Sequence, residues 1–379
     1  MTMKKNKGAA GLYIHIPFCR RKCLYCDFCS YPDRDSATLQ GYVERLCREL
    51  ADRAPSLGQR EIDTVYFGGG TPTLLPPAHF VHLLDTVRAH YTLAPDAEIT
   101  TECNPATADE GKLSALRSLG INRLSIGMQS ADDGELAALG RIHSAAQAKD
   151  TVREARKAGF DNVSLDIMYG IPTQTRDSFR RTLDAVLALE PEHISAYSLI
   201  LEEGTPFFEV RDSLALPDED AVCDMTAEAL SILRGAGYER YEISNFAKSG
   251  YRSRHNLHYW NLDDYLGVGI AAHSLIGRVR EQNRPDLAAY LGGKDIGERE
   301  ELLDDRTLCD EYVMLRLRLA DGVNKREFCT RFGASFDARY GEQVQKFARM
   351  GLMTDTPDAA AFTDQGFMVS NALLAELLF

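Results

Sequence analysis

The sequence has few of the features that would set it apart from ordinary globular proteins. It has one tryptophan in 379 residues and no biased tract longer than the alanine run at 359–361, which argues against disorder and fibrous repeats. It also has no apolar run long enough to cross a membrane, and residues 1–10 contain no hydrophobic signal core. Basic residues number 43 against 56 acidic ones, and the net charge of −13 disfavours nucleic acid as a partner. We expect a soluble cytoplasmic protein of about two or three domains.

The cysteines are the first distinctive feature. Nine of them, an odd number, make a disulfide framework improbable, and five are scattered as ordinary small residues would be. Cys19, Cys23, Cys26 and Cys29 are clustered. Their spacing fits a helical core stripe, a zinc site with Cys29 as fourth ligand, or an iron–sulfur cluster on three thiolates with one iron open. The charged residues 20–22 favour an exposed loop, but spacing alone does not decide between zinc and iron.

Residues 11–237 alternate between strand-like and helix-like segments. Segments rich in β-branched and aromatic residues predict strands at 11–17, 62–67, 98–102, 123–128, 163–169 and 193–201. Apolar stripes predict helices within 76–91, 113–119 and 222–233. This alternation implies an α/β fold with a parallel sheet and right-handed crossovers, and a closed or partly closed barrel fits six such units.

Polar residues and glycines fall at the ends of several predicted strands: Gly69, Gly70, Thr71, Glu102, Gln129 and Asp166. In a parallel sheet these positions should converge with the cysteine loop, which follows the first strand. Each residue alone would more often be a turn, a cap or a strand-end hydrogen bonder, and Arg141 alone would be a surface charge. Together they are suited to hold a zwitterionic amino acid and a ribose, which need donors and acceptors of both signs.

The stretch Tyr13-Ile-His15-Ile-Pro-Phe-Cys19-x3-Cys23-x2-Cys26 resembles the cluster motif of the radical S-adenosylmethionine (SAM) superfamily. More narrowly, nearly the whole chain resembles the branch that contains oxygen-independent coproporphyrinogen III oxidase and HemW-type haem chaperones. The resemblance implies an incomplete (β/α)6 barrel with a [4Fe–4S] cluster on Cys19, Cys23 and Cys26. It implies that SAM binds the open iron and that an electron from the cluster cleaves SAM into methionine and a 5′-deoxyadenosyl radical. The implied SAM pocket comprises Tyr13, Tyr25, Gly69, Gly70, Thr71, Glu102, Gln129, Arg141 and Asp166.

Two features resemble the HemW type more than the oxidase. Only 18 residues precede Cys19, and Cys26-Asp-Phe-Cys29 replaces a Cys-x-Cys ending, so we expect Cys29 to be a non-ligand. The hexapeptide at 255–260 matches the His-Asn-x-x-Tyr-Trp signature of HemW-type chaperones. An imidazole can ligate haem iron and aromatic rings can pack on a porphyrin. The resemblance therefore implies a haem site at His255, Asn256, Tyr259 and Trp260; without it, His255 would be interpreted as a satisfied histidine in a loop above an aromatic core.

The chain divides into three predicted regions. Residues 1–237 form the partial barrel with the cluster loop, 238–290 form a small α+β extension with the aromatic signature, and 291–379 form a helical, winged-helix-like domain. The charged stretch 294–306 is predicted to be a linker or an exposed helix. Acidic surroundings argue against DNA binding by the last domain, which we interpret as a cover or docking surface.

The sequence therefore predicts a haem chaperone that binds a [4Fe–4S] cluster, SAM and haem and delivers haem to acceptor proteins. The alternatives are an oxygen-independent coproporphyrinogen III oxidase, which forms protoporphyrinogen by radical decarboxylation, and a zinc protein of barrel fold. Whether SAM is cleaved productively, and hence whether the chain is an enzyme, stays open. The partners implied by the resemblance are haem-requiring acceptors, a flavodoxin-type electron donor, the inner face of a membrane and a second copy of the chain.

Overall fold

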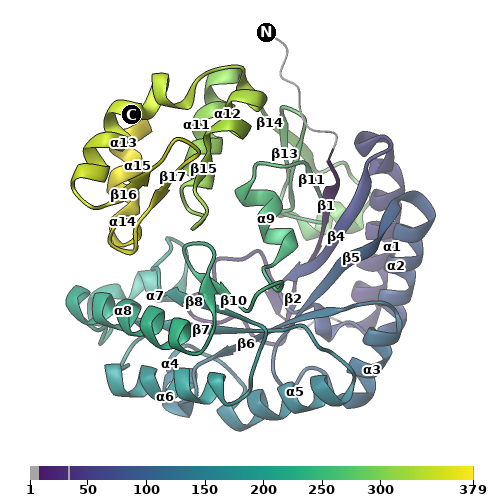
Figure 1. Ribbon diagram of the computed structural model, residues 1–379. Coiled ribbons are helices and arrows are strands. Elements are labelled where there is room, and N and C mark those ends of the chain that lie inside the picture. The colour runs from purple at the N-terminus through teal and green to yellow at the C-terminus, as the bar shows by residue number, and fades with distance from the viewer. Residues whose placement is uncertain (1–7, 33–34, 379) are drawn as a thin grey trace.

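A single curved sheet of twelve strands dominates the computed structural model, which describes residues 8–32 and 35–378 (Figure 1). Its six central strands are the six predicted ones: β1 (Ala10–Ile16), β4 (Glu61–Gly69), β5 (Thr92–Cys103), β6 (Arg123–Gln129), β7 (Val163–Tyr169) and β8 (His193–Ser198). They pair in parallel in this order. The sheet curves without closing. The predicted α/β fold with an incomplete barrel is confirmed.

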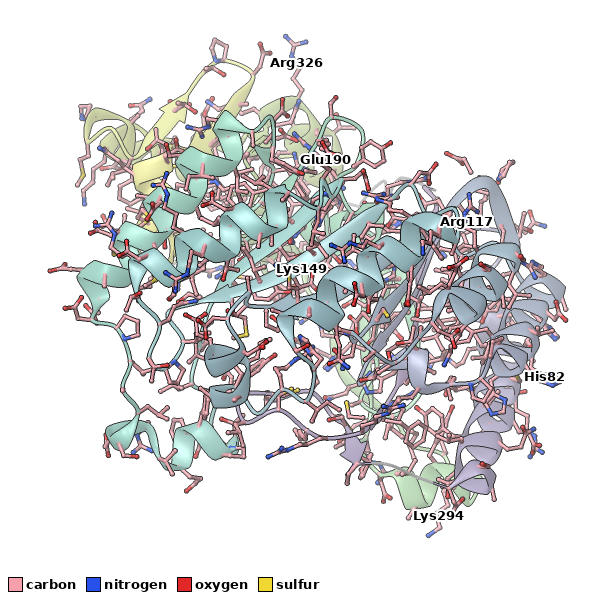
Figure 2. The ribbon with its side chains drawn as sticks, turned by 90° about the horizontal axis from the view of Figure 1, so that it is seen from below. His82, Arg117, Lys149, Glu190, Lys294 and Arg326 are labelled. Atoms are coloured by element: carbon pink, nitrogen blue, oxygen red, sulfur yellow. The ribbon has the colours of Figure 1, made fainter. Side chains whose placement is uncertain are left out.

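Helices cover the convex face of the sheet, and the three predicted helices are among them (Figure 1). The layer consists of α1 (Ser36–Arg53), α2 (Pro77–His90), α3 (Glu110–Ser118), α4 (Asp133–Ala138), α5 (Ala145–Lys157), α6 (Arg176–Leu187) and α8 (Glu219–Gly235). Figure 2 shows this layer from below, with His82 on α2, Arg117 on α3 and Lys149 on α5. The short helix α7 (Pro206–Glu209) follows β8, and single 3-10 turns lie at 54–57, 72–74 and 211–213.

Side chains alternate between the two faces of the sheet, as strand geometry requires. Leu12, Ile14 and Ile16 of β1 are fully buried in the hydrophobic core between sheet and helices. The positions between them face the concave side, and the corresponding positions of β4–β8 are mostly polar. The barrel interior therefore carries many polar side chains, unlike a core packed with branched apolar side chains.

Residues beyond 237 continue the same sheet at both edges. At one edge β11 (Tyr265–Val268) pairs in parallel with β1, followed by antiparallel β12 (His273–Ile276), β13 (Val279–Asn283) and β14 (Gly297–Leu302). At the other edge β8 pairs with β10 (Asn245–Ala247) and then β9 (Glu239–Arg240). The prediction of a linker or exposed helix at 294–306 is wrong, since β14 lies within it. A strand at the edge of a sheet tolerates charged residues, so charge did not exclude one.

Helix α9 (Arg254–Trp260) lies on the concave side of the sheet and contacts β1 and β4 (Figure 1). The remaining small elements of the first 302 residues are β2 (Phe18–Cys19), β3 (Tyr31–Pro32) and α10 (Leu287–Leu291). The predicted 238–290 region contains strands β9–β13 and helix α9, which carries the aromatic signature. Helix α9 lies inside the curve of the sheet (Figure 1).

The C-terminal residues form a second hydrophobic core around Tyr312, Phe328 and Phe336. Its elements are α11 (Asp305–Arg316), β15 (Val323–Asn324), α12 (Lys325–Phe332), α13 (Phe336–Arg349), β16 (Met353–Asp355), β17 (Ala359–Phe362), α14 (Asp364–Met368) and α15 (Ser370–Leu378). Helices with a three-stranded sheet agree with the expected winged-helix-like domain. Asp364 ties it to the barrel through ion pairs with Arg234 and Arg240. Within the described chain, no helix has the length and apolar character needed to cross a membrane.

Candidate functional site

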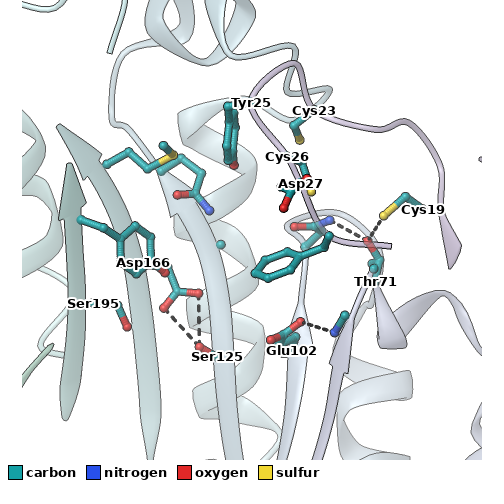
Figure 3. Close-up of a pocket in the computed structure, with 18 of the residues that line it drawn as sticks. Cys19, Cys23, Tyr25, Cys26, Asp27, Thr71, Glu102, Ser125, Asp166 and Ser195 are labelled. Atoms are coloured by element: carbon teal, nitrogen blue, oxygen red, sulfur yellow. Dashed lines mark hydrogen bonds between the residues drawn. The ribbon is translucent and has the colours of Figure 1, made fainter. Parts of the chain in front are cut away.

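A cavity of about 530 Å³ lies inside the curve of the sheet (Figure 3). Its wall combines the cysteine loop with the concave faces of β4–β8. Twelve of the predicted site residues line it: Cys19, Cys23, Tyr25, Cys26, Gly69, Gly70, Thr71, Glu102, Gln129, Arg141, Asp166 and Asn256. Four do not: Tyr13, His255, Tyr259 and Trp260. The structure thus separates the predicted residues into a group at the cavity, which includes Asn256 of α9, and a second group of four that lies on β1 and α9 away from the cavity wall.

The cysteine loop leaves β2 and places three thiols at the cavity. Cys19 is only 8% exposed, and the Thr71 hydroxyl donates to its Sγ at 3.5 Å. The Arg141 guanidinium donates to Cys23 Sγ, also at 3.5 Å. Burial raises the pKa of the Cys19 thiol and raises that of Cys26 to about 11, so a metal bound here must displace protons from the thiols.

The chemistry of the donor set is compatible with an iron–sulfur cluster. Three thiolates can bind three irons of a [4Fe–4S] cluster and leave the fourth iron open. Among residues 8–32 and 35–378, no three His, Cys, Asp or Glu side chains come together in a way that could hold one ion. Cys29 does not line the cavity, and its carbonyl accepts a hydrogen bond from His15 Nε2 at 2.9 Å.

A chain of hydrogen bonds supports the cysteine loop from neighbouring strands. Arg141 donates to Asn104 Oδ1 at 2.7 Å and to the Gly127 carbonyl at 2.6 Å, and Asn104 Nδ2 donates to the Thr71 hydroxyl at 2.7 Å. Both ends of this chain also contact thiols, Arg141 at Cys23 and Thr71 at Cys19. The chain therefore fixes two cysteines relative to the ends of β4, β5 and β6. The sequence analysis did not select Asn104.

The glycine turn after β4 is required by close packing. A Cβ on Gly69 would lie 2.4 Å from the His15 ring, and one on Gly70 would lie 2.7 Å from the Phe18 carbonyl oxygen. The N–H groups of Gly69, Gly70 and Thr71 donate within the protein, to Glu102, Ile16 and Phe18. The turn can therefore offer a ligand close approach and carbonyl oxygens, while its N–H groups are already used.

Two carboxylates face the cavity from β5 and β7. Glu102 accepts hydrogen bonds from the Tyr66 hydroxyl at 3.0 Å and from Gly69 N at 3.1 Å, and Asp166 accepts from the Ser125 hydroxyl at 3.1 Å (Figure 3). Burial raises the pKa of Glu102 to about 7 and raises that of Asp166 as well. Gln129 has a positive φ of 64° and keeps a buried, unpaired Oε1. The cavity therefore presents carboxyl and amide oxygen atoms to a ligand that donates hydrogen bonds.

His255 lies on α9 and is 1% exposed. Its Nδ1 is hydrogen bonded to the Thr64 hydroxyl and its Nε2 to the Tyr259 hydroxyl, each at 2.8 Å. The ring stacks on Tyr66, with centroids 5.0 Å apart, and Tyr66 stacks on Tyr13 at 6.1 Å. Burial lowers the pKa of His255 well below its usual value. Both ring nitrogens are occupied, so coordination of iron by His255 requires these two hydrogen bonds to break.

The cavity has further wall residues that the sequence analysis did not select: Arg123, Ser125, Met168, His193, Ser195, Tyr197 and Asn245. Most of them alternate with core residues on the predicted strands β6, β7 and β8. The period of two was therefore a usable signal for them. Asn245 comes from β10, which no pattern predicted.

Comparisons with known proteins agree with this arrangement. Residues 13–186 match the Radical SAM superfamily, and residues 303–369 match the HemN C-terminal domain. The heme chaperone HemW of Escherichia coli (strain K12) is 36% identical over 370 residues, covering 96% of this chain and 97% of that protein. The heme chaperone HemW of Bacillus subtilis (strain 168) is 34% identical over 374 residues, covering 97% and 98%. Coproporphyrinogen III oxidase (HemN) from Escherichia coli superposes with a TM-score of 0.85 at 24% identity, covering 98% and 91%, which shows a shared fold.

Proposed function

The chain belongs to the HemW family of the radical SAM superfamily, and on this premise we propose that it is a haem chaperone. It binds a [4Fe–4S] cluster, SAM and haem, and it delivers haem to acceptor apoproteins. The observation that carries the proposal is the identity of 34–36% with proteins named heme chaperone HemW over nearly the full length of both chains. The fold shared with coproporphyrinogen III oxidase does not separate the two functions.

Cys19, Cys23 and Cys26 are the proposed cluster ligands, and a reduced cluster held there would supply an electron to SAM. Arg141 and Thr71 hold the thiols in place and their donors offset negative charge on the sulfur atoms. Glu102, Gln129 and Asp166 supply acceptors for the amino group and the ribose hydroxyls of SAM. The polar cavity and its volume, within the usual range for small-molecule sites, support this assignment.

The proposed haem site is His255 with Asn256, Tyr259 and Trp260. The buried imidazole implies that α9 must shift before iron reaches it, so haem uptake has a conformational step. Asn256 lines the cavity beside the SAM residues, which supports communication between the two sites. A second candidate contact for haem is formed by Phe28 and Ile200, which line the cavity and are 68% and 67% exposed. Arg21 and Lys22 line the same cavity.

The remaining partners rest on family resemblance alone. We include in the proposal a cytoplasmic location, a flavodoxin-type electron donor, peripheral membrane contact and a homodimer formed after cluster binding. Analytical ultracentrifugation of apo and cluster-loaded protein tests the dimer, which predicts a larger sedimentation coefficient for the loaded form only.

Haem transfer is the decisive experiment. Anaerobically reconstituted protein loaded with haem is mixed with an apo acceptor such as apomyoglobin, with and without SAM, and the acceptor's absorbance spectrum is followed. A second protein that traps dissociated haem is present throughout. Haem transfer from the loaded protein that is faster than transfer from free haem under these conditions supports the chaperone function. In a parallel arm, reduced holoprotein receives coproporphyrinogen III and SAM. Protoporphyrinogen formed over many turnovers would make the oxidase the correct function. A colourless protein with one tightly held zinc would contradict both.

A further inference from the structure

One buried cation in the cavity has no role so far. Arg123, the first residue of β6, is 2% exposed, and its Nε is buried without a hydrogen-bond partner. No described residue forms an ion pair or a side-chain hydrogen bond with its guanidinium, which lines the cavity. A guanidinium has five N–H donors and stays charged when buried, so burial without an acceptor is unfavourable. The Arg123 guanidinium can therefore donate to a ligand in the cavity.

The two carboxylates of the cavity do not satisfy this cation directly. Glu102 accepts from Tyr66 and Gly69, and Asp166 accepts from Ser125, while neither accepts from Arg123. Burial raises the pKa of both carboxyls, and the charge of Arg123 opposes that rise through space. The guanidinium is therefore near these groups, but its donors stay unused.

Other polar atoms of the same cavity are unpaired as well. Asn245 Oδ1 and Gln129 Oε1 both belong to residues of the cavity wall and are buried without partners. Buried polar groups in folded proteins are normally hydrogen bonded. Unsatisfied donors and acceptors that gather in one cavity indicate a polar ligand.

We propose that Arg123 is the floor of a carboxylate-binding subsite in this cavity. The planar fork of a guanidinium matches the two oxygens of a carboxylate, which an ammonium or an amide does not. Arg123 begins β6, whereas the cysteine loop lies at the opposite ends of the strands, so the carboxylate must arrive on an extended arm. The haem of the proposed function carries such arms in its propionates, whereas the methionyl group of SAM belongs at the cluster end of the cavity. The proposal that the arm is a haem propionate rests on the proposed function, whereas the observation that the Arg123 guanidinium lacks a partner does not.

The test compares three probes on cluster-loaded protein: haem, haem dimethyl ester and SAM. Haem binding is followed by the Soret band and by quenching of Trp260, the only tryptophan, and SAM binding by calorimetry. If the arm is a propionate, Arg123→Gln weakens haem binding about tenfold or more and leaves the ester unchanged, while wild type prefers haem to the ester. SAM binding should be unchanged in Arg123→Gln, because the methionyl group belongs at the cluster, at the opposite ends of the strands. Arg123→Lys keeps the charge without the fork and should be intermediate.

The control is Arg240→Gln. Arg240 is also a poorly exposed arginine, but it pairs with Asp364 and lies outside the cavity, so all three affinities should stay at the wild-type value. The subsite is wrong if Arg123→Gln binds haem as wild type does, or loses haem and its ester equally. The wild-type preference for haem over the ester can be measured without any variant, should one fail to fold. Wild type that binds no haem at all contradicts the chaperone function and the subsite together, whereas wild type that binds haem and its ester equally contradicts the subsite alone.

Discussion

The cysteine loop and helix α9 carry motifs of comparable specificity, yet the fold treats them differently. The loop presents three thiols to a cavity, where their neighbours Thr71 and Arg141 add hydrogen bonds to sulfur. Helix α9 packs His255 against Tyr66 and satisfies both of its nitrogens. One region is arranged to receive a ligand as it stands, and the other is closed.

The difference teaches that a matched motif identifies residue types and not their accessibility. Residues after the carboxyl ends of parallel strands face the shared crevice, so their position in the fold guarantees access. Residues on a helix gain no such guarantee, because the face they occupy can be buried. The variants below test whether the two regions differ in function as they do in structure.

The largest effect is expected at the loop. Cys23→Ser removes one of three proposed cluster ligands and the sulfur that Arg141 contacts, so iron and sulfide content after reconstitution should fall nearly to zero. The measurement is chemical iron and sulfide analysis together with visible absorbance. Cys329→Ser is the matched control, since Cys329 is exposed in the C-terminal domain. Equal cluster content in both variants would contradict the ligand assignment.

On α9 the dominant effect should be on stability. His255→Ala deletes a buried stacked ring and leaves Thr64 and Tyr259 without partners, which should lower the free energy of unfolding by about 2–4 kcal/mol. Urea unfolding followed by circular dichroism measures this. The cluster should still assemble, and haem affinity should fall.

Unchanged haem affinity in His255→Ala would remove His255 from the haem site, whatever its effect on stability. Asp166→Asn provides the opposite pattern, weaker SAM binding with little change in unfolding. Loss of the cluster in His255→Ala would mean that the two regions are not separable.

A smaller, pH-dependent effect is expected at Glu102. Burial raises its pKa from about 4.5 in the unfolded chain to about 7, so the folded state binds more protons than the unfolded state between these values. Ionisation of Glu102 therefore lowers the free energy of unfolding as pH rises through this window, by roughly 3 kcal/mol in full. Burial lowers the pKa values of His15 and His143 to about 4, which acts in the opposite direction over the lower part of the window.

The difference between wild type and Glu102→Gln isolates the carboxyl. Melting temperatures of the two proteins from pH 4 to pH 8 should diverge in favour of the variant as pH rises. Parallel curves would show that Glu102 has an ordinary pKa and that its cavity is well solvated.

The smallest effect is expected for Cys29→Ser. The thiol lies off the cavity wall, and the hydrogen bond to His15 is made by the Cys29 carbonyl, which the substitution keeps. Cluster content and haem affinity should both match wild type. A loss of cluster here would reopen Cys29 as a ligand and with it the zinc alternative.

The parallel sheet and most of the cavity were predictable because both follow from short-range rules. Strand segments such as 123–128 and 163–169 have strong β-branched and aromatic patterns, and the carboxyl-end rule then collects Glu102, Gln129 and Asp166 at one place. Arg123 followed from the same alternation but was overlooked, since a lone arginine in a strand gives no sign that it lacks a partner. Strand β14 could not be predicted, because its pairing depends on the strand beside it. The alternative interpretation of His255 as a satisfied histidine agrees with the structure, but its partner Thr64 lies too far away in the sequence to be named in advance.

The pairing of β11 with β1 joins residues 265–268 to residues 11–14. During synthesis the first strand of the barrel is thus exposed to solvent on one side until more than two thirds of the polypeptide has left the ribosome. An uncovered strand edge is a template for pairing with other chains, and contacts so distant in sequence form slowly. The protein is therefore most vulnerable to aggregation before β11 pairs with β1. A cluster that binds the thiols before that pairing would bind to an incompletely folded sheet.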